Sequence, residues 1–244
     1  MHRHETVRPA TQGQFKEVSA ALIQAIPDMS FAEMQKLVRR KRVWARKVSE
    51  ILREVSGFYP VPELLLLDPW QEFYRDIFGI EKDFSSLVDS LAIPTHKDGF
   101  DRLIVVLAGM TPNRLFAKCK ELFPAWRYTE DLDQIKSDRE PDHDYAIWVR
   151  DRVEADEELK NLSANNTKAR GVVGITLPER LLYELKYFME TGKHLDLKNI
   201  TLCTGSRGPG ACVPGVDWRG GDLSVGWGDP DSRSDGIRVR PVVP

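Results

Sequence analysis

The stretch that decides the fold class of this chain is CTGSRGPGACVPGVDWRGGDLSVGWGDPDSRSDGIRVRPVVP, residues 203–244. It contains nine of the seventeen glycines and five of the fifteen prolines. This composition excludes a helix, and the short apolar stretches between Gly, Pro and Asp predict a meander of short strands. We therefore expect the chain to end in a small, glycine-rich antiparallel β-sheet.

The sequence before this stretch mixes helix and strand signals. Thr176 and Glu179 form a capping box at the start of a helix that Gly192 ends. Residues 103–107 are apolar throughout, which predicts a strand covered on both faces, and residues 145–149 predict another. These signals together predict an α+β fold.

Further helix and strand boundaries can be expected in the middle of the chain. Asp68-Pro69 predicts a cap and a first helical residue, with Gly79 at the end of that helix. Thr111-Pro112 predicts the start of another helix, and residues 126–128 predict a strand. A strand, a helix and a strand in this order allow a parallel crossover, and a sheet built from hairpins is the alternative.

The first 57 residues predict three short amphipathic helices, one of which starts at a capping box formed by Ser30 and Glu33. None of them could bury its apolar stripe alone, so we expect a small helical module. The chain then divides into four parts: a helical module at 1–57, a central α/β portion at 58–160, a linker at 161–175, and a helix with the β-meander at 176–244.

Composition narrows the classes of function. The chain has 35 basic and 37 acidic side chains, so no overall field attracts it to nucleic acid or to an acidic membrane. Its longest strongly apolar run, residues 103–108, is too short to cross a bilayer, and no apolar stretch follows the charged start as in a secretory signal. Three scattered cysteines form no disulfide framework. We expect a cytoplasmic protein without membrane association.

One segment is strongly basic, with seven positive side chains and no acid between residues 36 and 47. These side chains are Lys36, Arg39, Arg40, Lys41, Arg42, Arg46 and Lys47. Such a cluster could neutralise phosphates and bind nucleic acid without sequence preference. It could equally form a solvated helix face, or dock against the acidic residues 151–158.

No pattern predicts a reactive centre, a metal site or a cofactor. Residues 202–210 look like an anion-binding loop, but strand-like sequence on both sides favours a hairpin turn. His194, Cys203 and Cys212 lack the close pairing of zinc ligands. Asp142, Glu158 and Lys160 match a nuclease pattern only loosely. That pattern needs the glutamate and the lysine on a strand beside the first acid, whereas the segment that contains Glu158 and Lys160 is acidic and helical in character. We assign no catalytic residue.

The terminal β-unit also carries aromatic and arginine side chains. Trp218 and Trp227 flank a turn at Gly220-Gly221 and could face each other across a hairpin, which would stabilise so small a sheet. Tryptophan with arginine is also typical of recognition surfaces. The candidate recognition surface consists of Arg207, Trp218, Trp227 and Arg238.

Four segments together resemble a bacterial protein family to which no activity is assigned. They are GFDRL at 99–103, YAIWVRD at 145–151, HLD at 194–196 and LCTGSR at 202–207. The resemblance covers about residues 70–244. It implies a bacterial or environmental-genome source, and it carries no cofactor or catalytic residue over to this chain.

These observations favour a non-enzymatic binding or protein-interaction protein with an unknown protein partner, because the chain has local recognition surfaces and no catalytic constellation. The first alternative is a nucleic-acid-binding accessory protein that uses residues 36–47. The second is an enzyme with a site near Gly109 to Thr111, at the carboxyl end of the strongest predicted strand.

Overall fold

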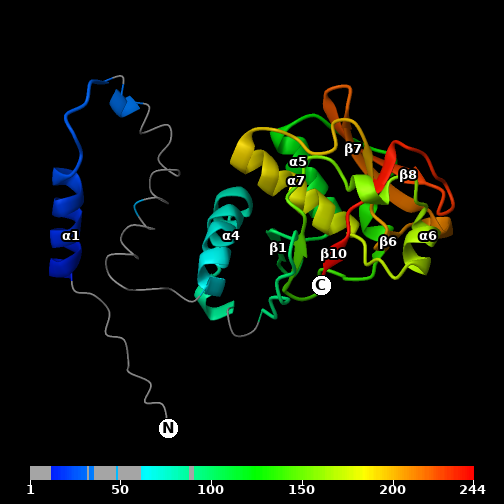
Figure 1. Cartoon of the computed structure of the whole chain (residues 1–244), viewed down its shortest axis with the longest axis horizontal. Coiled ribbons are helices and arrows are strands. Elements are labelled where there is room, and N and C mark those ends of the chain that lie inside the picture. The colour runs from blue at the N-terminus through cyan, green and yellow to red at the C-terminus, as the bar shows by residue number, and fades with distance from the viewer. Residues whose placement is uncertain (1–11, 32, 36–47, 49–61, 88–90) are drawn as a thin grey trace, which may run out of the picture. The chain divides into compact units, whose positions relative to one another are not determined.

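The structure is a computed structural model that describes residues 12–31, 33–35, 48, 62–87 and 91–244 (Figure 1). The chain forms two compact units, residues 1–60 and 61–244. In the first unit, α1 spans Gln12–Gln24. The predicted capping box is present: the Ser30 amide donates to Glu33 Oε2 at 2.9 Å, and the Glu33 amide donates to Ser30 Oγ at 3.4 Å. The basic cluster at 36–47 lies outside the described residues.

The second unit combines helices with short strands, which confirms the α+β class. Its helices are α4 (Pro62–Phe78), α5 (Pro112–Leu122), α6 (Ala164–Ala169) and α7 (Leu177–Thr191), with 3-10 turns η1 (Phe84–Leu87), η2 (Leu132–Gln134), η3 (Glu157–Leu159) and η4 (Pro209–Ala211). Its strands are β1 (Arg102–Val106), β2 (Ala125–Arg127), β3 (Lys136–Ser137), β4 (Tyr145–Val149), β5 (Ile200–Leu202), β6 (Ser206–Arg207), β7 (Val213–Arg219), β8 (Asp222–Gly228), β9 (Ile237–Val239) and β10 (Val242–Val243).

The two strongest predicted strands pair with each other. β1 and β4 are antiparallel, and β10 joins the other edge of β4. Helix α4 contacts this sheet, because Tyr74 donates its hydroxyl to the Val105 carbonyl at 2.7 Å and Trp70 donates to the Leu103 carbonyl at 3.2 Å. The strands on either side of α5, β1 and β2, lie in different sheets, so the parallel crossover that this order of elements allows does not form. β1 pairs antiparallel with β4 instead.

The glycine-rich C-terminal stretch supplies most of a second, five-stranded sheet in the order β2-β8-β7-β5-β9. Strands β7 and β8 form an antiparallel hairpin whose turn is Gly220-Gly221, both with positive φ (66° and 96°). Strands β2 and β9 add to this sheet in parallel with their neighbours. The predicted antiparallel meander is confirmed at its centre and extended at both edges.

Helix α7 lies at the middle of the second unit, next to α5 and β1 (Figure 1). The predicted capping box starts it: the Thr176 amide donates to Glu179 Oε2 at 2.8 Å, and the Glu179 amide donates to Thr176 Oγ1 at 3.4 Å. Gly192 ends it with a φ of 67°. Residues 177 to 186 are all buried, charged side chains included. Helix α7 therefore carries polar groups into the core.

Several local predictions need correction. α4 begins at Pro62 and runs through Pro69, so Asp68-Pro69 does not start the helix, although Gly79 does follow its end with a φ of 65°. Trp218 pairs with Leu223 and Trp227 pairs with Pro214, so the two indoles do not face each other across the hairpin. A two-residue turn at Gly220-Gly221 sets this register.

Two predicted connections contain secondary structure of their own. The segment after β5 connects β5 to β7, which pair antiparallel as a hairpin requires, and within this connection β6 pairs with β3. Ser137 and Ser206 share a hydrogen bond of 2.8 Å. The predicted linker at 161–175 contains α6, within which Ala164 and Thr167 are fully buried.

Candidate functional site

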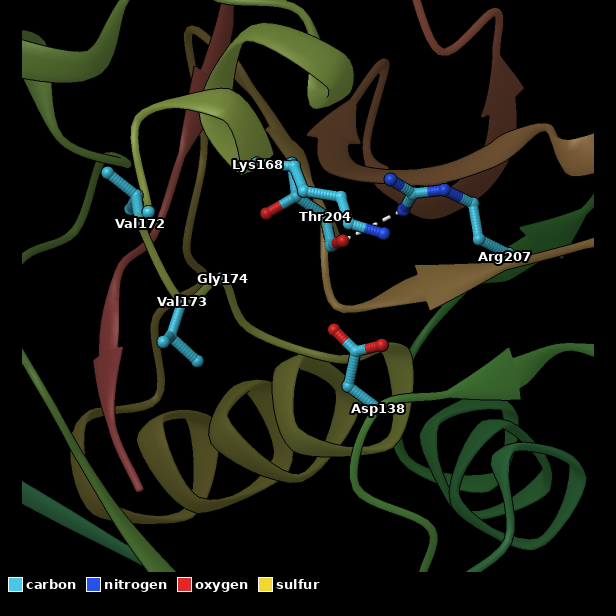
Figure 2. Close-up of a pocket in the computed structure, with 8 residues that line it drawn as sticks. Asp138, Lys168, Val172, Val173, Gly174, Thr204 and Arg207 are labelled. Atoms are coloured by element: carbon cyan, nitrogen blue, oxygen red, sulfur yellow. Dashed lines mark hydrogen bonds between the residues drawn. The ribbon is translucent and has the colours of Figure 1, made fainter.

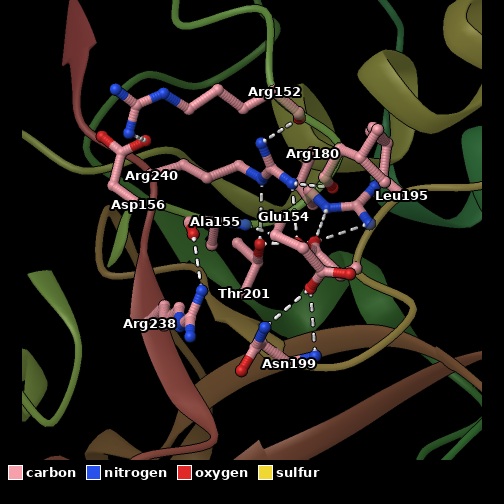
Figure 3. A network of polar contacts seen from close by, with 12 residues as sticks. Arg152, Glu154, Ala155, Asp156, Arg180, Leu195, Asn199, Thr201, Arg238 and Arg240 are labelled. Atoms are coloured by element: carbon pink, nitrogen blue, oxygen red, sulfur yellow. Dashed lines mark hydrogen bonds and ion pairs between the residues drawn. The ribbon is translucent and has the colours of Figure 1, made fainter. Parts of the chain in front are cut away.

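A buried ionic network occupies the centre of the second unit (Figure 3). Asp196 accepts from Arg240 Nη2 at 2.6 Å and from Arg180 Nε at 3.0 Å, and Thr201 Oγ1 donates to the same carboxylate at 2.5 Å. Arg180 and Asp196 are fully buried, and Arg240 is 2% exposed. Buried charges are stable only when paired and hydrogen-bonded, and this arrangement meets both conditions for the carboxylate.

Backbone carbonyls and a second carboxylate complete the network. Arg240 donates to the carbonyls of Arg152 and Val153 at 2.9 and 2.7 Å. Arg180 Nη1 donates to Glu184 at 2.8 Å. Burial by itself opposes ionisation of Asp196, but Arg240 and Arg180 outweigh it and hold the pKa of Asp196 below its ordinary value. The network ties α7, β5 and the chain end together and leaves no carboxylate of its own for a substrate.

His194 is held between aromatic rings beside this network. Its Nδ1 lies 2.9 Å from Glu184 Oε1. Its ring stacks on Trp218 with centroids 3.3 Å apart, and on Phe188 with centroids 5.0 Å apart. A histidine paired with a carboxylate is a common catalytic arrangement, but here both ring faces are covered. We therefore interpret His194 as a structural residue.

The cysteines contribute no nucleophile to this region. Cys119 and Cys203 are fully buried, and burial raises the pKa of each thiol well above its ordinary value, so both are protonated at neutral pH. Cys212 is half-buried and its Sγ lies 3.0 Å from the Pro209 carbonyl. In the described part of the chain, no group of three or more His, Cys, Asp or Glu side chains could hold a metal ion.

An open groove of about 570 Å³ lies on the surface where β2, β8 and η4 meet. We call it the aromatic groove; it is lined by Tyr128, Thr129, Asp131, Gln134, Pro209, Cys212 and Trp227. Tyr128 is 69% exposed. Trp227 packs across Gly208, where an added Cβ would lie 2.5 Å from the indole ring. Glycine at 208 therefore allows the indole to lie along the groove wall.

The charge of the aromatic groove is negative. Asp131 accepts hydrogen bonds from Asn113 Nδ2 at 2.7 Å, the Asp133 amide at 3.0 Å and Gln134 Nε2 at 3.2 Å. The bond from Asn113, then the other two, lowers the pKa of Asp131, so its carboxylate is ionised at neutral pH. The lining includes no basic side chain. A positively charged occupant is therefore favoured.

A smaller cavity of about 280 Å³ is lined by residues from the end of α6, the segment after α6, the segment around β6 and the residue after β3 (Figure 2). We call it the charged cavity; it is lined by Asp138, Lys168, Gly171, Val172, Val173, Gly174, Thr204 and Arg207. Lys168 lies in the last turn of α6, Thr204 lies between β5 and β6, Arg207 is in β6, and Asp138 follows β3. Figure 2 shows the Asp138 carboxylate on one side of the space and Lys168 and Arg207 on the other.

The residues of the candidate recognition surface lie apart from one another. Arg207 lines the charged cavity and Trp227 lines the aromatic groove. Trp218 is half-buried against His194, and Arg238 forms an ion pair with Glu157. Their role in recognition stays a prediction, and so does nucleic-acid binding by residues 36–47.

The enzyme site near Gly109 was predicted because parallel sheets place their sites at the carboxyl ends of strands, and this argument does not apply to the observed sheet. A site at the carboxyl end of a strand is typical of parallel sheets, whereas β1 pairs antiparallel with β4. Thr111 uses its hydroxyl to cap α5, accepting from the Arg114 amide at 3.4 Å. The Gly109 amide donates to the Pro141 carbonyl at 2.8 Å. An enzymatic activity stays a prediction without an assigned site.

No protein-family model matches the chain, and neither the curated proteins nor the solved structures include a significant match to it. Among the described residues, no helix is both long and apolar enough to cross a bilayer.

Proposed function

We propose that this chain is a non-enzymatic binding protein that takes an extended, basic segment of a partner protein in the aromatic groove. The observation that carries the proposal is the combination of two aromatic rings, Tyr128 and Trp227, with the ionised carboxylate of Asp131 and no cation in the lining. A lysine or arginine side chain over an aromatic face gains from the ring quadrupole, and a carboxylate beside it adds an ion pair.

Charges around the groove support a basic partner. Glu130 and Asp133 flank Asp131 in sequence and are exposed. Arg127, the nearest basic residue in sequence, donates to Asn113 Oδ1 at 2.9 Å and lies over the Phe116 ring, with 5.1 Å from Cζ to the centroid. It is therefore engaged with α5. The segment 128–134 presents carboxylates without a competing cation of its own.

The position of β2 supports an extended partner. β2 is at one end of the strand order in the five-stranded sheet, and such an edge strand can pair with an added strand. Trp126, within β2, is 52% exposed, and its ring meets that of Tyr128 edge-on at 6.4 Å. An extended segment along this edge would contact both rings while a basic side chain enters the groove.

The test is a titration of the full chain with the peptide acetyl-Ala-Arg-Ala-Arg-Ala-amide. Binding is measured by the change in tryptophan fluorescence and by calorimetry. Its neutral counterpart has citrulline in place of arginine. We expect the arginine peptide to bind at least fivefold more tightly than the citrulline peptide. Asp131→Asn and Trp227→Leu should each remove most of that difference, because each deletes one half of the cation site.

Asp235→Asn is the matched control, because Asp235 is an exposed carboxylate outside the groove. It should leave the preference unchanged. Equal binding of the two peptides would overturn the proposal, since the groove would then recognise no charge. Choline binding more tightly than the arginine peptide would replace the protein partner by a small quaternary ammonium ligand.

We also propose nucleic-acid binding by residues 36–47 as the second candidate function. The observation that favours it is the run of seven positive side chains without an acid. Such a cluster binds phosphates through counterion release, so the affinity would fall steeply with salt.

A further inference from the structure

The charged cavity differs from the buried network of Arg180, Asp196 and Arg240 in the state of its charges, and two of its charged residues, Asp138 and Lys168, are exposed. Asp138, Lys168 and Arg207 form no ion pair with any described residue, whereas the interior charges of Arg180, Asp196 and Arg240 are paired. Arg139, next to Asp138, is bonded to Glu179 at 2.6 Å instead. Two cations and one carboxylate thus surround a single cavity without neutralising each other.

The guanidinium of Arg207 is held in position by backbone carbonyls of the residues just before it. Its Nη1 donates to the carbonyls of Thr204 and Ser206, both at 2.8 Å. This bonding uses one nitrogen of the guanidinium, and none of the described residues accepts a hydrogen bond from the other two. A guanidinium fixed in this way loses little conformational entropy when it binds a carboxylate.

Thr204 provides a second, independent observation. Thr204 as a whole residue is 9% exposed, and its hydroxyl has no hydrogen-bond partner among the described residues. Leaving a buried hydroxyl without a partner costs free energy. Thr204 lies at the wall of the cavity, next to Gly174, where an added Cβ would overlap the hydroxyl oxygen. The Thr204 hydroxyl is therefore one buried polar group at this wall that the described residues leave unsatisfied.

We propose that the charged cavity binds a free α-amino acid with a small side chain. The carboxylate of the ligand would lie toward Arg207 and Lys168, and its ammonium group toward Asp138. These are the groups that Figure 2 shows on opposite sides of the space. Val172 and Val173 offer an apolar wall to the side chain. The volume of about 280 Å³ is at the lower end for small-molecule sites, which suits a ligand of this size.

The experiment is a calorimetric titration of the full chain with L-alanine and two analogues. N-acetyl-L-alanine lacks the ammonium group and L-alaninamide lacks the carboxylate. Because a hydrogen bond to a charged group contributes strongly to binding, each analogue should bind at least tenfold more weakly than L-alanine. Lys168→Met and Asp138→Asn should each weaken binding of L-alanine by a similar factor.

Folding does not confound this test, because neither side chain has an ion-pair partner to lose, and circular dichroism checks each variant. Lys193→Met, at an exposed lysine outside the cavity, is the control and should bind as the original chain does. Inorganic phosphate binding more tightly than L-alanine, and more tightly still to Asp138→Asn, would overturn the amino-acid assignment in favour of a simple anion site. If L-alanine does not bind at a concentration of about 10 mM, which would reveal a dissociation constant in the millimolar range, the proposal is overturned altogether.

Discussion

The imidazole of His194 lies flat against the indole of Trp218, with ring centroids 3.3 Å apart and an interplanar angle of 7°. Trp218 is on β7, and His194 follows the end of α7, so this contact fixes the helix end against the five-stranded sheet. Phe123 adds an edge-on contact to both rings, at 5.0 and 5.8 Å. Trp218 therefore contributes to packing between the end of α7 and the five-stranded sheet.

Trp218→Ala should lower the free energy of unfolding by about 2–4 kcal/mol, because it removes a packed indole and leaves a cavity beside His194. Urea denaturation followed by circular dichroism measures this. Trp126→Ala is the matched control, since that indole is 52% exposed, and it should cost less than about 1 kcal/mol. Equal costs for the two substitutions would contradict the packing role.

Asp196→Asn should destabilise the chain by about 3–5 kcal/mol, because it leaves the buried guanidinium groups of Arg180 and Arg240 without their shared carboxylate. The comparison is Arg219→Gln, which breaks the ion pair with Asp217 by changing a 70% exposed side chain. That change should cost about 0.5 kcal/mol or less. Similar costs would mean that the network contributes no more than a surface pair.

The Asp196 contribution should also depend on pH. Because its pKa is lowered in the folded state, the stability from its ionised form is present above the unfolded pKa, about 3.9, and is lost as the pH falls through the lower folded value. The stability difference between the original chain and Asp196→Asn should stay constant from pH 7 to pH 5 and shrink below about pH 4. A difference that widens between pH 7 and pH 5 would show instead that burial raises this pKa.

Gly205→Ala should destabilise the second unit by about 1–3 kcal/mol. An added Cβ would lie 2.7 Å from the Gly174 carbonyl oxygen and 3.2 Å from that of Ile175, and both are backbone atoms that cannot move aside cheaply. Gly226→Ala is the control, because an added Cβ there meets no heavy atom within 4 Å. It should leave the melting temperature unchanged or raise it slightly. A neutral Gly205→Ala would contradict the close approach of the two segments.

Reversing Arg39, Arg40 and Arg42 to Glu should abolish retention of the full chain on heparin or duplex DNA. In the original chain, log affinity should fall linearly with log salt, with a slope near the number of phosphates neutralised. Reversing the exposed Lys97, Lys120 and Lys193 changes the net charge equally and should leave most retention intact. If both triple variants lose retention alike, binding depends on net charge and the cluster has no special role.

Local structure in this protein was predictable because its signals act within a few residues. The capping box at Thr176 and Glu179, the turn at Gly220-Gly221 and the apolar run at 103–107 each specify their own backbone conformation. Among the predicted helix starts, Asp68-Pro69 misled, because α4 runs through Pro69 although an interior proline removes a backbone hydrogen bond.

The sequence by itself determined the α+β class, most helix ends and the glycine turn, since caps, periodicity and turn residues depend on neighbours in the chain. Only the tertiary structure decided that β6 pairs with β3, that Asp196 joins Arg180 to Arg240, and that Asp138 faces Lys168 and Arg207 across a cavity. The physical reason is that charged side chains can pair with many partners in an unfolded chain. The selection among them depends on which distant segments the packed core brings within about 3 Å of each other.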